Sequence, residues 1–189
     1  MIVLGIDPGT AVTGYGVVDS ASGGAVALVG GGGPRLVAQA AHGGPRLIEC
    51  GVIRTPARAP LAARLKDIFD GVTELIVRHR PDALAVEDVF FARNVRTSLV
   101  LGHARGVVLL AGAQAGLAVH EYSPALIKKT VVGRGGATKE QVQFMVARLL
   151  RLKSAPHPAD AADGVACALT CVMSAGTLRL QARLTPRLS

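Results

Sequence analysis

The chain has 189 residues, half of them hydrophobic, which is enough for one substantial core and favours a single domain. Lysine and arginine total 21 against 13 acidic residues, and the formal charge of +8 favours an anionic partner such as nucleic acid. The three cysteines have no zinc-type spacing, which fits a reducing compartment, and no apolar stretch reaches the roughly 18 residues of a membrane span. With no leader pattern at the N-terminus, we expect a soluble, cytoplasmic protein without membrane association.

The N-terminal third of the chain is predicted to form three antiparallel strands around an acidic turn. Residues 2–6 are a short apolar strand that ends at Asp7, and the Pro-Gly-Thr sequence that follows favours a hairpin into a second strand over residues 13–18, which two glycines interrupt. Residues from about 20 to 46 are rich in glycine and alanine and have no periodicity, which indicates a flexible loop insertion. Residues 47–54 resume as the third strand.

The rest of the chain alternates helices and strands. Apolar side chains recur at helical spacing from residue 61 until Pro81, and residues 83–86 are a short apolar run typical of a strand buried on both faces. That strand ends at Glu87. Downstream we expect a helix over 97–115, a strand over 117–121, a helix opened by Ser123 and Pro124, a helix over 138–152 with a Thr138-x-x-Gln141 capping box, and a last helix over 160–173.

The order of these elements predicts the fold class. Three antiparallel strands followed by two helix-strand units indicate an α/β fold with a mixed five-stranded sheet, three strands antiparallel and then two parallel, flanked by helices. The ribonuclease H fold belongs to this topology class. We expect one such domain over residues 1–177, with the loop insertion inside it, and a basic C-terminal tail over residues 178–189.

Four acidic residues occupy positions where they can converge. Asp7 and Glu87 each follow a short apolar strand, where the chain reaches the edge of the sheet. Asp160 and Asp163 lie three residues apart at the start of the last helix, so both side chains lie on one face of its first turn. Clustered carboxylates repel one another unless a hard cation holds them, and oxygen ligands of this kind suit magnesium or manganese. The sequence therefore predicts a metal site.

Three of these four acids also have a simpler interpretation. Asp160 and Asp163 are at a helix start, where carboxylates are common for capping and dipole reasons. Asp7 precedes a turn, which aspartate favours on its own account. Glu87 has no such explanation, because a charge directly after a buried strand is rarely placed there for stability. The four together favour the metal site over the separate explanations.

Several segments, in this order, resemble the RuvC-type crossover junction endodeoxyribonucleases, which are Holliday junction resolvases. Together they cover most of residues 1–19 and 47–173, and their combination is far more specific than any one of them. The matching segments are GIDPGT (5–10), TGYG (13–16), LAVEDVF (84–90), LGHARG (101–106), KTVVG (129–133) and DAAD (160–163). The glycine-rich stretch at about 20–46 is longer than the family's usual connection.

The resemblance implies a homodimer that binds a four-way DNA junction and nicks two opposed strands symmetrically, leaving 5′-phosphate ends, in recombination and DNA repair. The resemblance also implies the branch-migration proteins RuvA and RuvB as partners. From the carboxylate chemistry we expect two Mg²⁺ ions per active site, with Mn²⁺ able to substitute, because such a pair can activate a water and stabilise the departing 3′ oxygen. The residues that fall on the family's catalytic, metal-binding positions are Asp7, Glu87, Asp160 and Asp163.

The resemblance also implies DNA-binding residues. Phe90 falls where the family has an aromatic side chain that stacks on a base near the junction centre, and the adjacent Phe91 is its competitor for that role. Four basic residues around a glycine-rich loop suit phosphate contacts that do not read sequence, although a solvated basic surface is the alternative. These residues are Lys128, Lys129, Arg134 and Lys139.

Two other functions fit parts of the pattern. The Asp-x-Gly-Thr turn at Asp7 also resembles the phosphate loop of actin-like and sugar-kinase-type phosphotransferases, but those enzymes need two such domains and 189 residues are too few. A non-catalytic junction-binding protein would share the fold and the basic charge. The intact set of four carboxylates favours the nuclease over both.

Overall fold

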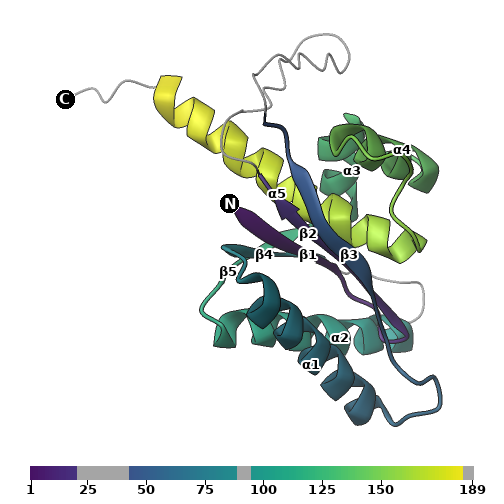
Figure 1. Cartoon of the computed structure of the whole chain (residues 1–189). Helices are drawn as coiled ribbons and strands as arrows, with labels where there is room; N and C mark the ends of the chain where they lie inside the picture. Colours follow the sequence, from purple (N-terminus) through teal and green to yellow (C-terminus); the bar gives the residue numbers. More distant parts are fainter. Residues whose placement is uncertain (21–42, 89–94, 185–189) are drawn as a thin grey trace.

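The computed structural model of the chain describes residues 1–20, 43–88 and 95–184, with side chains described as far as residue 176. Its described strands form one sheet in the order β3-β2-β1-β4-β5 (Figure 1). The β1–β2 and β2–β3 pairs are antiparallel, whereas the β1–β4 and β4–β5 pairs are parallel. This confirms the predicted mixed sheet. The strands are β1 (Ile2–Asp7), β2 (Val12–Asp19), β3 (Arg46–Arg54), β4 (Ala83–Glu87) and β5 (Ala118–Tyr122).

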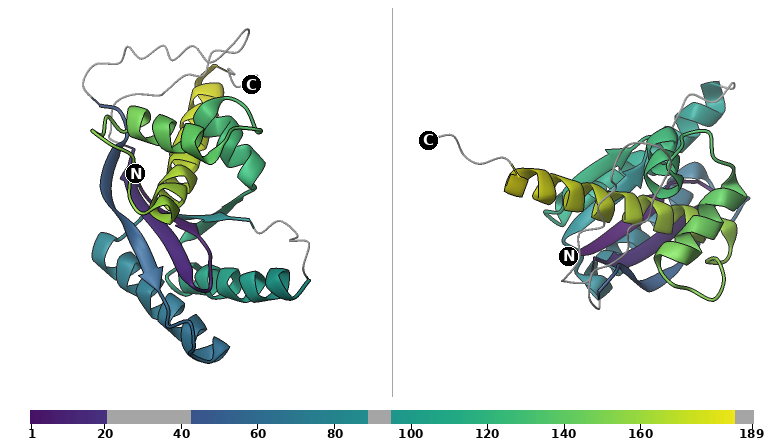
Figure 2. Two further views of the ribbon diagram at one scale, coloured as in Figure 1. Left: turned by 90° about the vertical axis from the view of Figure 1, so that its right-hand side faces the viewer. Right: turned by 90° about the horizontal axis from the view of Figure 1, so that it is seen from above.

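Helices cover both faces of the sheet and create two separate cores (Figures 1 and 2). One core lies between the sheet and the first two helices, and the other lies between the sheet and the last helix, against which the two short helices also pack. Among the described residues, no helix is both long and apolar enough to cross a lipid bilayer. The helices are α1 (Leu61–His79), α2 (Val95–Gln114), α3 (Pro124–Val132), α4 (Lys139–Leu149) and α5 (Ala159–Leu184).

The helix starts that the sequence predicts are built as expected. The Ser123 hydroxyl accepts a hydrogen bond from the Leu126 backbone N–H at 3.3 Å, with a proline at the first turn of α3. At the start of α4, Thr138 and Gln141 form the reciprocal capping box. These caps fix the orientation of the two helices that carry the basic residues.

The end of the chain differs from the prediction. We expected the last helix to stop at residue 173, but α5 runs to Leu184, so the predicted start of the basic tail at residue 178 lies inside a helix. Leucine, arginine, glutamine and alanine dominate residues 178–184 and are strong helix formers, and the next proline is Pro186. Most of the predicted loop insertion, residues 21–42, and the last five residues of the tail lie outside the described residues.

Close packing of α5 on the sheet depends on glycines in β2. A Cβ atom on Gly14 would collide with the backbone carbonyl of Asp160, and one on Gly16 would lie 2.6 Å from the Cα atom of Val165. The glycines that interrupt the strand pattern are therefore the places where the backbone of α5 approaches the sheet. This approach brings the start of α5 next to the end of β1.

Replacing Gly14 by alanine is expected to destabilise the fold by about 1–3 kcal/mol, because the new methyl group must push the start of α5 away. The matched control is Gly176→Ala, since Gly176 lies in α5, the helix that Gly14 contacts, but has open space around it. There alanine should be neutral or stabilise by roughly 0.5–1 kcal/mol. Thermal unfolding followed by circular dichroism compares them, and equal melting temperatures for the two variants would contradict the close approach.

Candidate active site

Strand alternation places two of the candidate acids on the same face of the sheet. In β4, Ala83 and Ala85 face the core under α5, while Leu84 and Val86 face α1 and α2. Glu87 continues the first series and therefore faces α5. In the neighbouring β1, Val3 begins the same alternation, which Asp7 continues at the end of the strand. Both side chains emerge at the carboxyl ends of adjacent parallel strands, beneath the start of α5.

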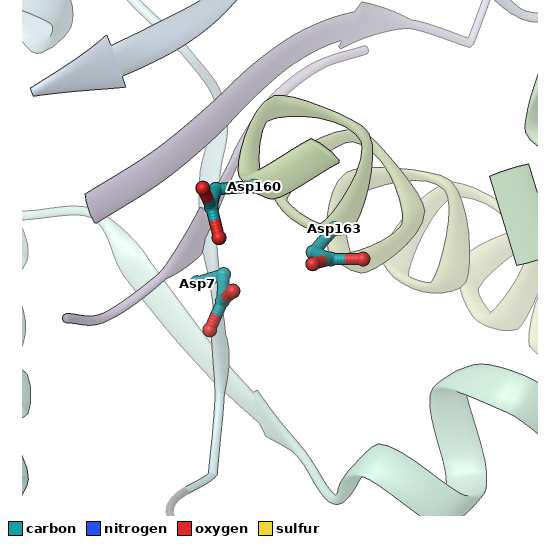
Figure 3. Close-up of side chains that lie close together, drawn as sticks. All are labelled: Asp7, Asp160 and Asp163. Atoms are coloured by element: carbon teal, nitrogen blue, oxygen red, sulfur yellow. The ribbon is translucent and has the colours of Figure 1, made fainter. Parts of the chain in front are cut away.

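The first turn of α5 brings two further carboxylates to this place. Oxygen atoms of Asp7, Asp160 and Asp163 all lie within 4.8 Å of one another, and Figure 3 shows the three side chains gathered between the strand end and the helix. Glu87 does not belong to this tight group, but its charge interacts with those of Asp7 and Asp163. The structure thus brings three of the four candidate acids into one cluster and places the fourth on the adjoining strand.

The carboxylates repel one another in a site that is largely shielded from water. The pKa of Asp7 is raised to about 7, mainly by burial and further by the negative charges of Asp163 and Asp160. The pKa of Glu87 is raised to about 8, again mainly by burial and further by the charges of Asp7 and Asp163. Burial also raises the pKa of Asp163. Such a set holds its charges at neutral pH only when a cation compensates them, so this donor set fits a hard divalent metal ion.

Lysine side chains supply part of that compensation. The Lys139 ammonium lies 2.6 Å from a carboxylate oxygen of Asp163, and this pairing raises the pKa of Lys139. Lys128, half-buried on α3, counteracts the raised pKa values of Glu87 and Asp163. Two of the four basic residues that we predicted to contact DNA therefore border the acidic cluster.

The remaining DNA-binding candidates are placed differently. Lys129 is exposed on α3, and Arg134 is exposed in the connection between α3 and α4. Arg134 also lines a mainly apolar pocket of about 550 Å³ that includes the exposed Phe144. Phe90 and its competitor Phe91 lie outside the described residues.

Sequence reasoning did not predict the pairing of Lys139 with Asp163. Both residues were identified as candidates, but they belong to different helices and no spacing rule connects them. One signal was available, since Lys139 is the first residue of α4, where the helix dipole disfavours a positive charge. A nearby anion offsets this mildly unfavourable position, and here the anion is the carboxylate of Asp163.

Comparisons with known proteins agree on one family. A family model described as "Crossover junction endodeoxyribonuclease RuvC" matches residues 29–171. A protein of that name from Heliobacterium modesticaldum is 47% identical over 174 residues, which cover 92% of this chain and 95% of the relative.

Solved structures agree with this family. The RuvC structure of Thermus thermophilus is 37% identical, with a TM-score of 0.74 over 96% of this chain and 97% of that one. The same protein in complex with Holliday junction substrate has a TM-score of 0.79 at 37% identity, over 94% of this chain and 96% of that one. These neighbours confirm the ribonuclease-H-like fold. With the family model and the relative matching most of its length, the chain belongs to the RuvC family of crossover junction endodeoxyribonucleases.

Proposed function

We propose that the chain resolves Holliday junctions in recombination and DNA repair, nicking two opposed strands with Asp7, Glu87, Asp160 and Asp163 as its catalytic, metal-binding residues. The observation that carries this proposal is the cluster of Asp7, Asp160 and Asp163 at the end of β1, with Glu87 on the neighbouring strand. The related T. thermophilus RuvC, solved with a Holliday junction substrate, supports four-way DNA as the ligand.

The cofactor that we propose is Mg²⁺, two ions per active site, with Mn²⁺ as a substitute. The four carboxylates would hold it, because hard oxygen ligands suit these ions and the crowded charges need a cation. When bound, the ions supply Lewis acidity that lowers the pKa of an attacking water and neutralises charge on the scissile phosphate and the departing 3′ oxygen. The packing of α5 on β1 and β2 keeps the carboxylates in place for this chemistry.

Basic residues on α3, on α4 and in their connection would position the DNA backbone. Lys128, Lys129, Arg134 and Lys139 lie on α3, α4 and their connection, so phosphates held there would approach the carboxylates from one side. Contacts of this kind orient DNA without reading its sequence. Phe90 is the proposed base-stacking residue at the junction centre.

Arg134→Ala is expected to weaken junction binding about equally for all junction sequences and to reduce the slope of log K against log salt by about 1. The reason is that an exposed phosphate contact releases roughly one counterion. The matched control is Arg148→Ala, since Arg148 is also exposed but lies in the last turn of α4. Fluorescence anisotropy across a salt series measures both slopes. Identical slopes for both variants and the parent would mean that Arg134 does not contact a DNA phosphate.

Symmetric nicking needs two active sites, so we also propose a homodimer. Val95, Leu99 and Leu110 expose 74%, 61% and 49% of their surface on α2, which supports a protein contact along this helix. RuvA and RuvB are the proposed branch-migration partners, and the cytoplasm is the proposed compartment.

The proposal is tested by comparing a synthetic four-way junction with a linear duplex made of the same sequences, in magnesium and in manganese. We expect paired nicks in opposed strands of the junction only, with 5′-phosphates that a ligase can seal, and no cleavage in EDTA. Tight junction binding in calcium without cleavage in either of the other metals would instead leave a non-catalytic junction-binding protein.

A further inference from the structure

Arg105 on α2 connects the ends of two neighbouring strands. Its Nε atom lies 3.4 Å from a carboxylate oxygen of Asp88, directly after β4, and its Nη2 atom forms an ion pair with Glu121 of β5. The guanidinium group therefore holds together the carboxyl ends of the last two strands of the sheet. It does so from the helix that packs on the face opposite to α5.

The residue held by Arg105 is the direct neighbour of Glu87. Along β4 the side chains alternate between the two cores, so Asp88 faces α2 while Glu87 faces α5. The backbone N–H of Asp88 also donates a hydrogen bond of 2.8 Å to the carbonyl of Tyr122 in β5. The backbone of Asp88 is thus held by a hydrogen bond, and its carboxylate has a longer charge contact with Arg105.

Glu87 itself lacks such support. Within the described ranges, no hydrogen bond or ion pair holds its carboxylate, whereas Asp163 has Lys139. The direction in which Glu87 points therefore depends on the backbone at the end of β4, and this backbone is fixed at the next residue. A contact at Asp88 acts on Glu87 through one peptide unit.

The two ion pairs that Arg105 forms with Asp88 and Glu121 contribute little to the stability of the fold. Asp88 and Glu121 expose 48% and 42% of their side chains, and exposed ion pairs contribute little to folding. The Nε atom of Arg105 is buried without a hydrogen-bond partner among the described residues, which is a cost rather than a gain. Stability alone therefore does not account for an arginine at this place.

We propose that Arg105 is a positioning residue for the metal site: by holding Asp88 and Glu121, it fixes the end of β4 and thereby the orientation of Glu87. This inference rests on the proposed role of Glu87 as a metal ligand. Groups that orient the ligands of a metal from outside typically change metal affinity or activity by about 10–100-fold when they are removed.

The test variant is Arg105→Gln, which removes the charge and both ion pairs. Its kcat for junction cleavage should fall by about 10–100-fold, and its affinity for Mn²⁺, measured without DNA by electron paramagnetic resonance, should fall by about 10-fold. The dissociation constant for the junction in calcium should stay the same. Arg105→Lys keeps the charge but cannot pair with both acids in the same geometry, so it should recover part of the loss.

Arg78→Gln is the matched control, because Arg78 also pairs with two acids, Glu49 and Glu74, away from the acidic cluster. It should keep the cleavage rate and the manganese affinity of the parent. If Arg105→Gln folds poorly, a variant that also carries Asp88→Asn and Glu121→Gln removes the uncompensated acids. We expect this neutral variant to regain the parent melting temperature but not the parent activity.

The outcomes separate the two proposals. If Glu87→Gln abolishes cleavage while Arg105→Gln cuts and binds manganese like the parent, Arg105 does not position Glu87 and this inference is wrong. Full activity of the neutral triple variant would overturn it too, since the arginine would then serve only to balance charge. If Glu87→Gln itself cleaves junctions at the parent rate, the proposed role of Glu87 as a metal ligand is wrong.

Discussion

Asp7→Asn is expected to abolish junction cleavage and leave junction binding intact. Asp7 contributes an oxygen to the cluster with Asp160 and Asp163, and the raised pKa of its carboxyl shows how strongly the surrounding site disfavours a further negative charge without a cation. Asparagine keeps the shape of the side chain but cannot offer a charged ligand. The loss should be on the order of 10³-fold, the effect of removing one preorganised electrostatic group from an active site.

The same substitution should make the metal-free protein more stable at alkaline pH. Above about pH 8 the buried carboxyl of Asp7 is ionised next to two like charges, and the neutral amide removes this repulsion. A gain of about 1–3 kcal/mol is expected, because active sites commonly exchange stability for function. Cleavage assays, junction binding in calcium, and thermal unfolding in EDTA measure the three effects.

Asp70→Asn is the control for this prediction, since Asp70 is an exposed carboxylate on α1 that pairs with Lys66. It should change neither cleavage nor melting temperature by much. Cleavage by Asp7→Asn at the parent rate would refute the assignment of the acidic cluster. Loss of junction binding by the same variant would mean that Asp7 acts on DNA affinity rather than on the chemistry.

Local sequence patterns predicted the sheet correctly and the strand ends to within one residue. The buried run before Glu87 has the length of a strand, and its alternation fixes which face Glu87 occupies. The turn after Asp7 and the capping box at Thr138 depend on a few neighbouring residues, so they can be predicted from the chain alone. The four-acid candidate set followed from these local features together with the family resemblance.

Contacts between distant segments could not be predicted in the same way. In the sequence Gly14 only interrupts a strand pattern, yet in the structure a side chain at this position would collide with the backbone at the start of α5. The pairing of Lys139 with Asp163 joins two helices, and Arg105 joins a helix to two strand ends. Each depends on packing that only the folded chain defines. The length of α5 was underestimated because the apolar pattern weakens before the helix ends.

The metal-free protein should become less stable as pH rises, which is the opposite of the usual behaviour of salt-bridged carboxylates. The pKa of Asp7 rises from 3.8 to about 7 and that of Glu87 from 4.5 to about 8. The folded state therefore holds these protons more tightly than the unfolded state. Folding loses stability as pH increases from the unfolded pKa values, near 4, through the folded ones, and the loss is complete only above about pH 9, beyond the folded pKa of Glu87.

Magnesium or manganese should reverse this loss, and the reversal should grow with pH. Metal ligands must be deprotonated, so near pH 6 the ion competes with protons on Asp7 and Glu87, whereas at about pH 9 it meets charged carboxylates. An ion at 100 times its dissociation constant adds roughly 2.7 kcal/mol of stability. Melting temperatures in EDTA and in saturating metal across this pH range give both curves.

Asp7→Asn provides the internal control for the pH series, because it removes one of the two strongly shifted groups. Its melting temperature in EDTA should fall less steeply with pH than that of the parent, and metal should stabilise it less at about pH 9. If the parent instead gains stability in EDTA between about pH 6 and pH 9, the carboxyls are not buried together as this structure places them. A metal effect that is the same at both ends of the range would show that the ion binds elsewhere on the protein, away from the protons that Asp7 and Glu87 release.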